Sequence, residues 1–224
     1  MNRLFRDRVD AGQLLAARLT RYANREDVLV LGLPRGGVPV AFEVATKLNA
    51  PLDVFVVRKL GVPGYEELAM GAIAGGGVRV FNTDVVRIYR IPGSVIDQVA
   101  AVQQRELERR EQTYRGHSKP PEIRGKIVIL VDDGIATGST MRAAIHAVRS
   151  QSPARLIVAV PVAPASQTCL ADDVDEWVIL MTPENFHAVG QWYTEFDQTS
   201  DEEVTQLLAK ATAQFRSGKS AEYS

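Results

Sequence analysis

The chain has 224 residues, and its 26 lysines and arginines almost balance its 27 aspartates and glutamates. This length suits one large domain, and the near-neutral charge gives no sign of a nucleic-acid partner. The single cysteine, Cys169, cannot form an internal disulfide, which favours a cytoplasmic location. We expect no signal peptide and no membrane segment, because no apolar run approaches the ~20 residues that a membrane span needs.

Short apolar runs alternate with amphipathic stretches along the chain. The predicted elements, in chain order, are helix 11–22, strand 28–33, helix 38–48, strand 52–57, a short strand near 70–74, strand 78–81, a long helix to about 114, strand 126–131, helix 139–150, strand 155–162, strand 176–181 and helix 201–215. Asp10 and Ser94 are the expected caps of the first and the long helix. This alternation predicts an α/β fold, with a mainly parallel central sheet flanked by helices. Ligands of such sheets bind at the carboxyl ends of the strands.

One such strand end carries an unusual string, "IVILVDDGIATGSTMRAAI", which begins at Ile127. Its second half is a glycine- and hydroxyl-rich turn that leads into a helix. Backbone N–H groups and the helix dipole favour a phosphate in such a turn. The residues that we assign to this phosphate site are Ala136, Thr137, Gly138, Ser139 and Thr140. The turn has no lysine, so it is not the nucleotide-binding loop GxxxxGK[ST].

The two aspartates in this string, Asp132 and Asp133, would repel a phosphate and so must face another group. Ionised carboxylates only accept hydrogen bonds, and the vicinal hydroxyls of a ribose are suitable donors. A magnesium ion near those hydroxyls would be a second suitable partner. Acids followed by a phosphate turn therefore predict a site for a ribose 5-phosphate. The alternative is an ordinary turn with capping polar residues.

The string "VILVDDGIATGST" resembles the signature of the type I phosphoribosyltransferases, which bind phosphoribosyl pyrophosphate (PRPP). The stretches "FRDRVDAGQLLA", "LGVPGYEELAMGAIA" and "FHAVGQWYTEF" are similar to a bacterial group of predicted phosphoribosyltransferases without an assigned substrate. The resemblance implies a PRPP-dependent transfer of ribose 5-phosphate to a nitrogenous acceptor, with Mg²⁺ and release of pyrophosphate. It implies that Asp132 and Asp133 serve catalysis and hold the metal indirectly, through ribose hydroxyls and water.

A second loop, "LPRGG", follows the strand at 28–33 and is the candidate pyrophosphate site. Arg35 offers a fixed positive charge with forked donors. Gly36 and Gly37 can form an anion-binding nest. In the family, a loop after the first strand of the sheet has this task. The alternative is a strand–helix turn whose glycines only allow tight packing.

The glycine-rich region from 61 to 77 follows the strand at 52–57, and we expect a mobile loop there that closes over the site. Arg58 and Lys59 stand at its start and are candidate catalytic cations for the pyrophosphate. Gly61 suits a hinge. Glu66 and Glu67 could bind metal or accept a proton, although a solvated loop face is the alternative. Closure would keep water from the transition state.

The acceptor pocket is the least defined part of the prediction. Val162 ends a strand where relatives often place base contacts, and Phe186, Trp192 and Tyr193 could stack on a planar acceptor. Packing in the core or in a lid is the alternative for these aromatic residues. His187 could touch a ligand or be an ordinary structural histidine.

The whole chain is predicted to form one phosphoribosyltransferase-like domain. We expect a core at about 25–182, a small hood built from about 1–24 and 183–215, and a disordered tail at 216–224. A homodimer is expected by analogy with the family. The alternatives to the transferase are a PRPP-binding sensor, a hydrolase and a pyrophosphorylase.

Overall fold

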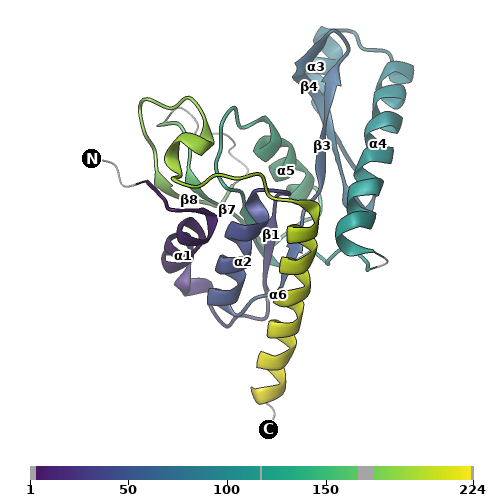
Figure 1. Ribbon diagram of the computed structural model, residues 1–224. Coiled ribbons are helices and arrows are strands. Elements are labelled where there is room, and N and C mark those ends of the chain that lie inside the picture. Colours follow the sequence, from purple (N-terminus) through teal and green to yellow (C-terminus); the bar gives the residue numbers. More distant parts are fainter. Residues whose placement is uncertain (1–3, 117, 166–173, 223–224) are drawn as a thin grey trace.

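The structure is a computed structural model, and it describes residues 4–116, 118–165 and 174–222. Its elements form a five-stranded parallel sheet with helices on both faces and a separate three-stranded antiparallel sheet (Figure 1). The α/β fold with a parallel central sheet is thus confirmed. In the part of the chain that is described, no helix is both long and apolar enough to cross a membrane.

The parallel sheet has the strand order β2-β1-β6-β7-β8. Its strands are β1 (Val28–Gly32), β2 (Leu52–Val54), β6 (Ile127–Val131), β7 (Arg155–Val162) and β8 (Glu176–Met181). The central strand β6 pairs with β1 and β7 along its whole length, and all five of its residues are buried. A strand buried on both faces is apolar throughout, which explains the unbroken run of branched residues before Asp132.

Helices cover both faces of this sheet. α1 (Arg8–Arg18) and α2 (Gly37–Leu48) lie on one face, where they bury Ile127, Ile129 and Val131 of β6. α5 (Ser139–Arg149) lies on the other face, with Val128 and Leu130. The alternation of side chains along the strand assigns these residues to the two faces.

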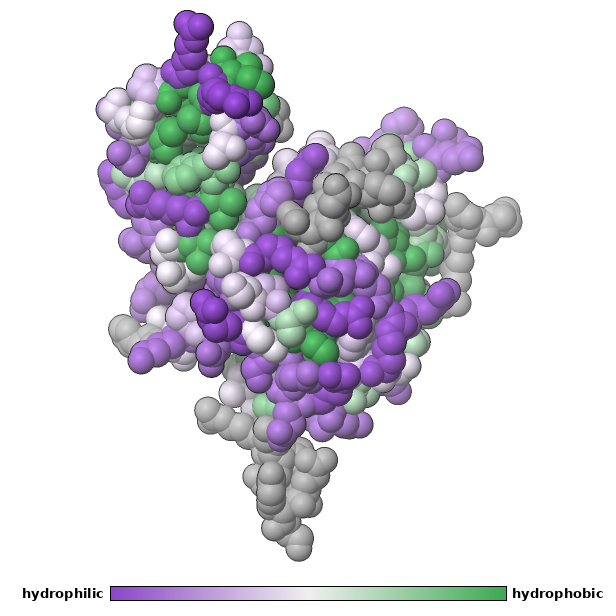
Figure 2. All heavy atoms as spheres, turned by 180° about the vertical axis from the view of Figure 1, so that it is seen from behind, coloured by the Kyte–Doolittle hydropathy of each residue, from purple (hydrophilic) through white to green (hydrophobic). Residues whose placement is uncertain are grey.

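The antiparallel sheet belongs to a lobe that stands off from the rest of the molecule (Figures 1 and 2). Its strands pair in the order β3-β4-β5, and they are β3 (Val57–Val62), β4 (Tyr65–Ala74) and β5 (Val78–Phe81). The short helix α3 (Thr83–Ile88) follows, and the long helix α4 (Gly93–Arg115) packs against β3 and β4. Figure 2 shows hydrophobic surface on this lobe beside the mostly hydrophilic face of the core.

The last helix, α6 (Asp201–Glu222), packs against α2, α4 and β2, so it joins the lobe to the core. The amino-terminal segment pairs instead with the region after β8. Phe5 N donates to Trp192 O at 3.0 Å, and Thr194 N donates to Phe5 O at 2.8 Å. The described part of the chain also contains the short 3₁₀ turns η1 (Thr20–Tyr22), η2 (Gly75–Gly77) and η4 (Val189–Trp192).

Several expected boundaries were wrong. The first helix begins at Arg8 and is capped by Asp7, whose carboxylate accepts from Asp10 N at 2.7 Å, so Asp10 is not the cap. The long helix begins after Pro92, and its first turn has no side-chain cap, so Ser94 does not cap it. The last helix continues beyond 215 as far as Glu222, where a disordered tail was expected. Extending a formed helix is cheap compared with starting one.

The largest difference concerns the region from 61 to 77. It is not an irregular loop but part of a β-hairpin, in which β4 alone has ten residues. The predicted strand 52–57 is divided, because the chain leaves the parallel sheet after Val54 and enters the small sheet at Val57. Glycines weaken a strand signal, yet Gly61 and Gly71 are required here by close contacts with neighbouring backbone.

Candidate active site

The two aspartates lie where the carboxyl ends of β1 and β6 meet. The loop after β1 folds against them, and Leu33 N donates to Val131 O at 2.9 Å. A Cβ on Gly36 would lie 2.0 Å from Asp133 Oδ2. A Cβ on Gly37 would lie 2.8 Å from Asp132 Cα. Both glycines are therefore needed because the loop lies directly on the acidic pair.

Both carboxyl groups of the pair are poorly solvated. Burial raises the pKa of Asp132 well above its ordinary value, and the neighbouring charge of Asp133 raises it further. Burial also raises the pKa of Asp133, although Arg8 opposes this shift. Asp133 N donates to Asp132 Oδ1 at 2.9 Å. Such a pair has an unmet demand for donors or cations, as a ligand site would.

Arg8 is the residue at this site that the sequence interpretation missed. Its Nε donates to Asp133 Oδ2 at 2.9 Å, and the two side chains are 13% and 15% exposed. Its guanidinium stacks over the ring of Phe196, 4.0 Å from the centroid. Tyr193 OH donates to Asp133 O at 2.6 Å. The only signal in the sequence is the "FRDRVDAG" string, which contributes to the family resemblance but does not indicate this contact.

The turn from Ala136 to Thr140 has the form expected of a phosphate site. Gly138 is the cap residue of α5 and has a φ of 73°, a conformation that favours glycine. Thr137 Oγ1 and Ser139 Oγ are 3.1 Å apart, so the two hydroxyls gather at the start of the helix. Ala136, Thr137 and Thr140 are exposed. The turn presents hydroxyls and first-turn amides to solvent, next to the acidic pair.

Arg35 lies in the loop after β1, as predicted for a pyrophosphate site. Its Nη1 is 3.9 Å from Asp201 Oδ1, at the start of α6. Asp201 also accepts from Tyr114 OH at 2.7 Å. Burial, followed by this hydrogen bond, raises the pKa of Tyr114 to about 12. The nest assigned to Gly36 and Gly37 is only partly available, because Gly37 N donates to Leu33 O at 3.0 Å within the turn.

The structure separates the two cations that the sequence placed together. Arg58 lies on the face of the small sheet that packs on α4, where its Nε donates to Gln103 Oε1 at 2.9 Å. Burial, and then the nearby Arg110, lower the pKa of Arg58. Lys59 pairs across the hairpin with Ala72 and therefore lies on the opposite face. Arg58 is thus not brought to the acidic pair.

The predicted hinge and acids lie in the hairpin. A Cβ on Gly61 would lie 2.6 Å from Glu66 O, so Gly61 serves close strand packing. Glu66 accepts from Gly64 N at 3.1 Å at the tip of the hairpin. Glu67 belongs to β4, and its side chain is outside the described part. None of the three is brought to the acidic pair.

The aromatic residues assigned to an acceptor pocket form the interior of the hood instead. Val162, Trp192 and Tyr193 are buried in one cluster with Phe5, and Phe186 stacks on Trp192 with centroids 6.5 Å apart. Within the described residues, the buried Trp192 Nε1 has no hydrogen-bond partner. His187 is exposed. Cys169 lies outside the described residues.

Comparison with known proteins decides the family. Residues 5–196 match the model of the family described as "Phosphoribosyl transferase domain". The chain belongs to this phosphoribosyl transferase family. A Mycobacterium tuberculosis protein (strain CDC 1551) called "Putative phosphoribosyl transferase MT0597" is 50% identical over 215 residues, which are 95% of this chain and 48% of that protein. The chain thus spans about half the length of the curated relatives that it matches.

The solved structure of TT1426 from Thermus thermophilus has the same phosphoribosyl transferase fold. It is 43% identical, with a TM-score of 0.85, and the match covers 92% of this chain and 98% of that one. A "Bifunctional protein PyrR" from Clostridium acetobutylicum is 28% identical over 132 residues, 59% of this chain and 54% of that protein. The resemblance drawn from the strand–turn–helix string is confirmed.

Proposed function

We propose that the chain transfers the ribose 5-phosphate group of PRPP to a nitrogenous acceptor, such as a nucleobase, and releases pyrophosphate. The observation that carries this proposal is the position of Asp132 and Asp133 between two loops of complementary chemistry. The turn at 136–140 offers hydroxyls and helix amides to a phosphate. The loop around Arg35 offers a guanidinium to a diphosphate.

In this proposal, the turn binds the 5-phosphate and the acidic pair accepts hydrogen bonds from the ribose hydroxyls. The partly buried carboxylates are poorly solvated, so donors from the sugar would replace missing water. Arg35 would bind the leaving pyrophosphate and stabilise its charge. No side-chain nucleophile is required, since positioning and charge stabilisation suffice for such a displacement.

The residues present fit a magnesium ion that is bound mainly through the substrate. Within the described residues, no group of three or more histidine, cysteine or acidic side chains could form a metal cage. Mg²⁺ commonly uses one or two carboxylates together with water and phosphate oxygens. Asp132 and Asp133 are those carboxylates here, acting through ribose hydroxyls and water. When bound, the ion would neutralise charge that develops on the pyrophosphate.

The first test is calorimetric titration of PRPP with and without Mg²⁺, followed by pyrophosphate release across nucleobases and small amines. Binding, and release with one acceptor class, would support the transferase. Binding without release for any acceptor would favour the PRPP sensor, and release without an acceptor would favour a hydrolase. No binding would overturn the assignment of the site. A cytoplasmic homodimer is part of the same proposal, and light scattering of the purified chain tests its oligomeric state.

A further inference from the structure

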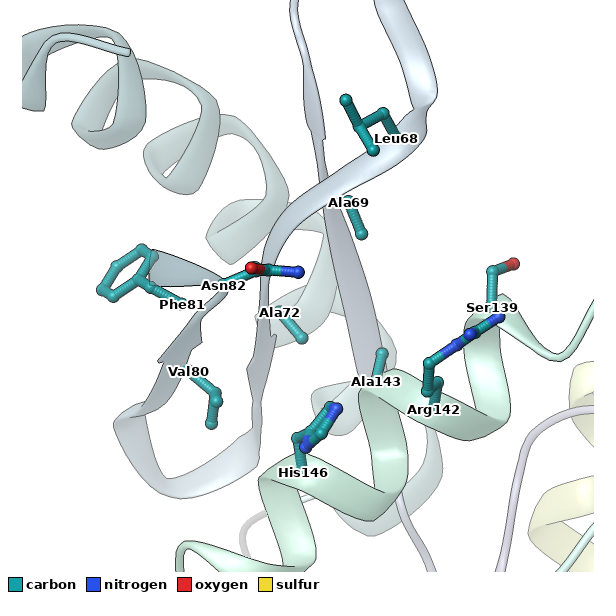
Figure 3. Close-up of a pocket in the computed structure, with 11 residues that line it drawn as sticks. Leu68, Ala69, Ala72, Val80, Phe81, Asn82, Ser139, Arg142, Ala143 and His146 are labelled. Carbon is teal, nitrogen blue, oxygen red and sulfur yellow. The ribbon is translucent and has the colours of Figure 1, made fainter. Parts of the chain in front are cut away.

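A cavity of about 420 Å³ lies outside the acidic pair, between α5 and the antiparallel sheet of the lobe (Figure 3). Its volume falls in the range of small-molecule sites, about 300–1,000 Å³. Three polar side chains border it from α5, namely Ser139, Arg142 and His146. They are three and four positions apart, so they share one face of the helix.

The opposite wall of the cavity is apolar and built from small side chains. Ala69 and Ala72 of β4 and Val80 of β5 form it, with Leu68 at its edge. Side chains of this size leave a flat surface on a pleated sheet, which suits a planar ring. Phe81 adds a ring that is 40% exposed.

The charge on the cavity wall is of one sign. Among the described residues that line it, none carries a carboxylate. Within the described part of the chain, the Arg142 guanidinium makes no hydrogen bond or ion pair, although its backbone N donates to Gly138 O at 2.8 Å. An unpaired guanidinium beside an apolar wall favours a ligand that carries an anionic group.

Asn82 adds a directional contact at the far end of the cavity. Its Oδ1 accepts from Val85 N at 3.1 Å, as the cap of α3. The amide nitrogen therefore remains as a donor, and Figure 3 shows this side chain beside the cavity. A ring nitrogen or carbonyl of a ligand could accept from it.

From these features we infer a second binding site, distinct from the acidic pair, for a flat aromatic ring that carries a phosphate or carboxylate group. The ring lies on the small apolar side chains of the sheet, and the anion binds Arg142 with Ser139 and His146 nearby. A nucleoside monophosphate has this chemistry and this size. Ser139 also belongs to the turn at 136–140, so an occupant would lie next to the phosphate turn.

The test uses probes without a ribose, because a nucleotide could also enter the proposed PRPP site. The full chain is titrated with 1-naphthyl phosphate and with 1-naphthoate, followed by naphthalene fluorescence. Binding of the phosphate alone would identify a phosphate site, and binding of both would identify a general anion site. We expect Arg142→Ala to weaken binding at least tenfold. Arg105→Ala, an exposed arginine on α4, should leave it unchanged.

A second variant keeps the charge and fills the cavity. Ala69→Leu should weaken the probe at least fivefold while thermal melts show a folded chain. Probe binding should persist with PRPP and Mg²⁺ at saturating concentration. Full displacement by PRPP, equal affinity in Arg142→Ala, or no binding of either probe would overturn the inference. The titration without PRPP gives its result even if PRPP does not bind, so this test is separate from that of the proposed function.

Discussion

Arg8 Nε binds Asp133 Oδ2 at 2.9 Å and so joins the first helix to the acidic pair across 125 positions of sequence. The same guanidinium donates through Nη1 to Asp197 O at 2.6 Å and stacks on Phe196. One side chain thereby connects the amino-terminal segment, the region after β8 and the centre of the candidate site. Because Arg8 and Asp133 are both largely buried, the pair is sensitive to loss of either member.

Arg8→Gln should lower the free energy of unfolding by about 3 kcal/mol, because it leaves the Asp133 carboxylate buried without its cation. Urea unfolding at pH 7 measures this change. PRPP binding should weaken as well, since Asp133 would no longer be held in place. Arg6→Gln is the matched control, because Arg6 is 73% exposed and lies 3.5 Å from Asp10. It should cost less than about 0.5 kcal/mol. Equal effects of the two substitutions would contradict the role given to Arg8.

Gly36→Ala should remove PRPP binding while the chain remains folded. The added methyl would lie 2.0 Å from Asp133 Oδ2, so either the loop or the carboxylate must move. A displacement of this size at a binding site can cost about a hundredfold in function. Gly93→Ala is the matched control, because nothing lies within 4 Å of its Cβ position. Calorimetry with PRPP and far-UV circular dichroism of both variants measure the two effects. Normal PRPP affinity in Gly36→Ala would show that the acidic pair does not bind the ligand.

The sequence predicted the parts of the fold that depend on local pattern. The five parallel strands could be read because strands such as β6 and β7 are buried on both faces and therefore wholly apolar. The phosphate turn could be read because Gly138 and its hydroxyl neighbours are adjacent in sequence. The β-hairpin could not, because the glycines at 61 and 71 look like loop residues until the neighbouring backbone is known.

The contacts that shape the site are long-range, and no pattern along the chain indicates them. Arg8 reaches Asp133 only after the hood has formed, and Arg35 approaches Asp201 only after α6 has packed on α2. Arg58 and Lys59 are adjacent in sequence, yet a strand sends neighbouring side chains to opposite faces. Had the region been recognised as a strand, this alternation would have separated their roles.

Asp132→Asn should stabilise the chain at neutral pH. Burial and then Asp133 raise the pKa of Asp132, so the native carboxyl binds its proton more tightly than the unfolded chain does. Its contribution to stability is therefore fully present below the unfolded pKa and is lost as the pH rises through the native pKa. The amide is neutral throughout and keeps an acceptor for Asp133 N.

At pH 7, the free energy of unfolding of Asp132→Asn should exceed that of the wild type by about 1 kcal/mol, with the advantage fading toward pH 4. Urea unfolding at a series of pH values gives this difference. Asp84→Asn, whose parent side chain is 73% exposed, should show no such trend. A gain for Asp132→Asn that stays constant with pH would mean that it does not arise from the buried charge.

The Arg35–Asp201 contact should compete with pyrophosphate. Asp201 Oδ1 lies 3.9 Å from Arg35 Nη1, so an incoming diphosphate must replace this carboxylate as the partner of the guanidinium. Arg35→Ala should weaken pyrophosphate binding at least tenfold, about 1.4 kcal/mol, and ribose 5-phosphate binding less than threefold. Asp201→Asn should instead tighten pyrophosphate about threefold, since the amide keeps an acceptor for Tyr114 but carries no charge. Glu203→Gln removes the same charge from an exposed position in the first turn of α6 and controls for the change in net charge. Calorimetric titration of both ligands distinguishes these cases, because a general electrostatic effect would change all three variants in proportion to charge alone.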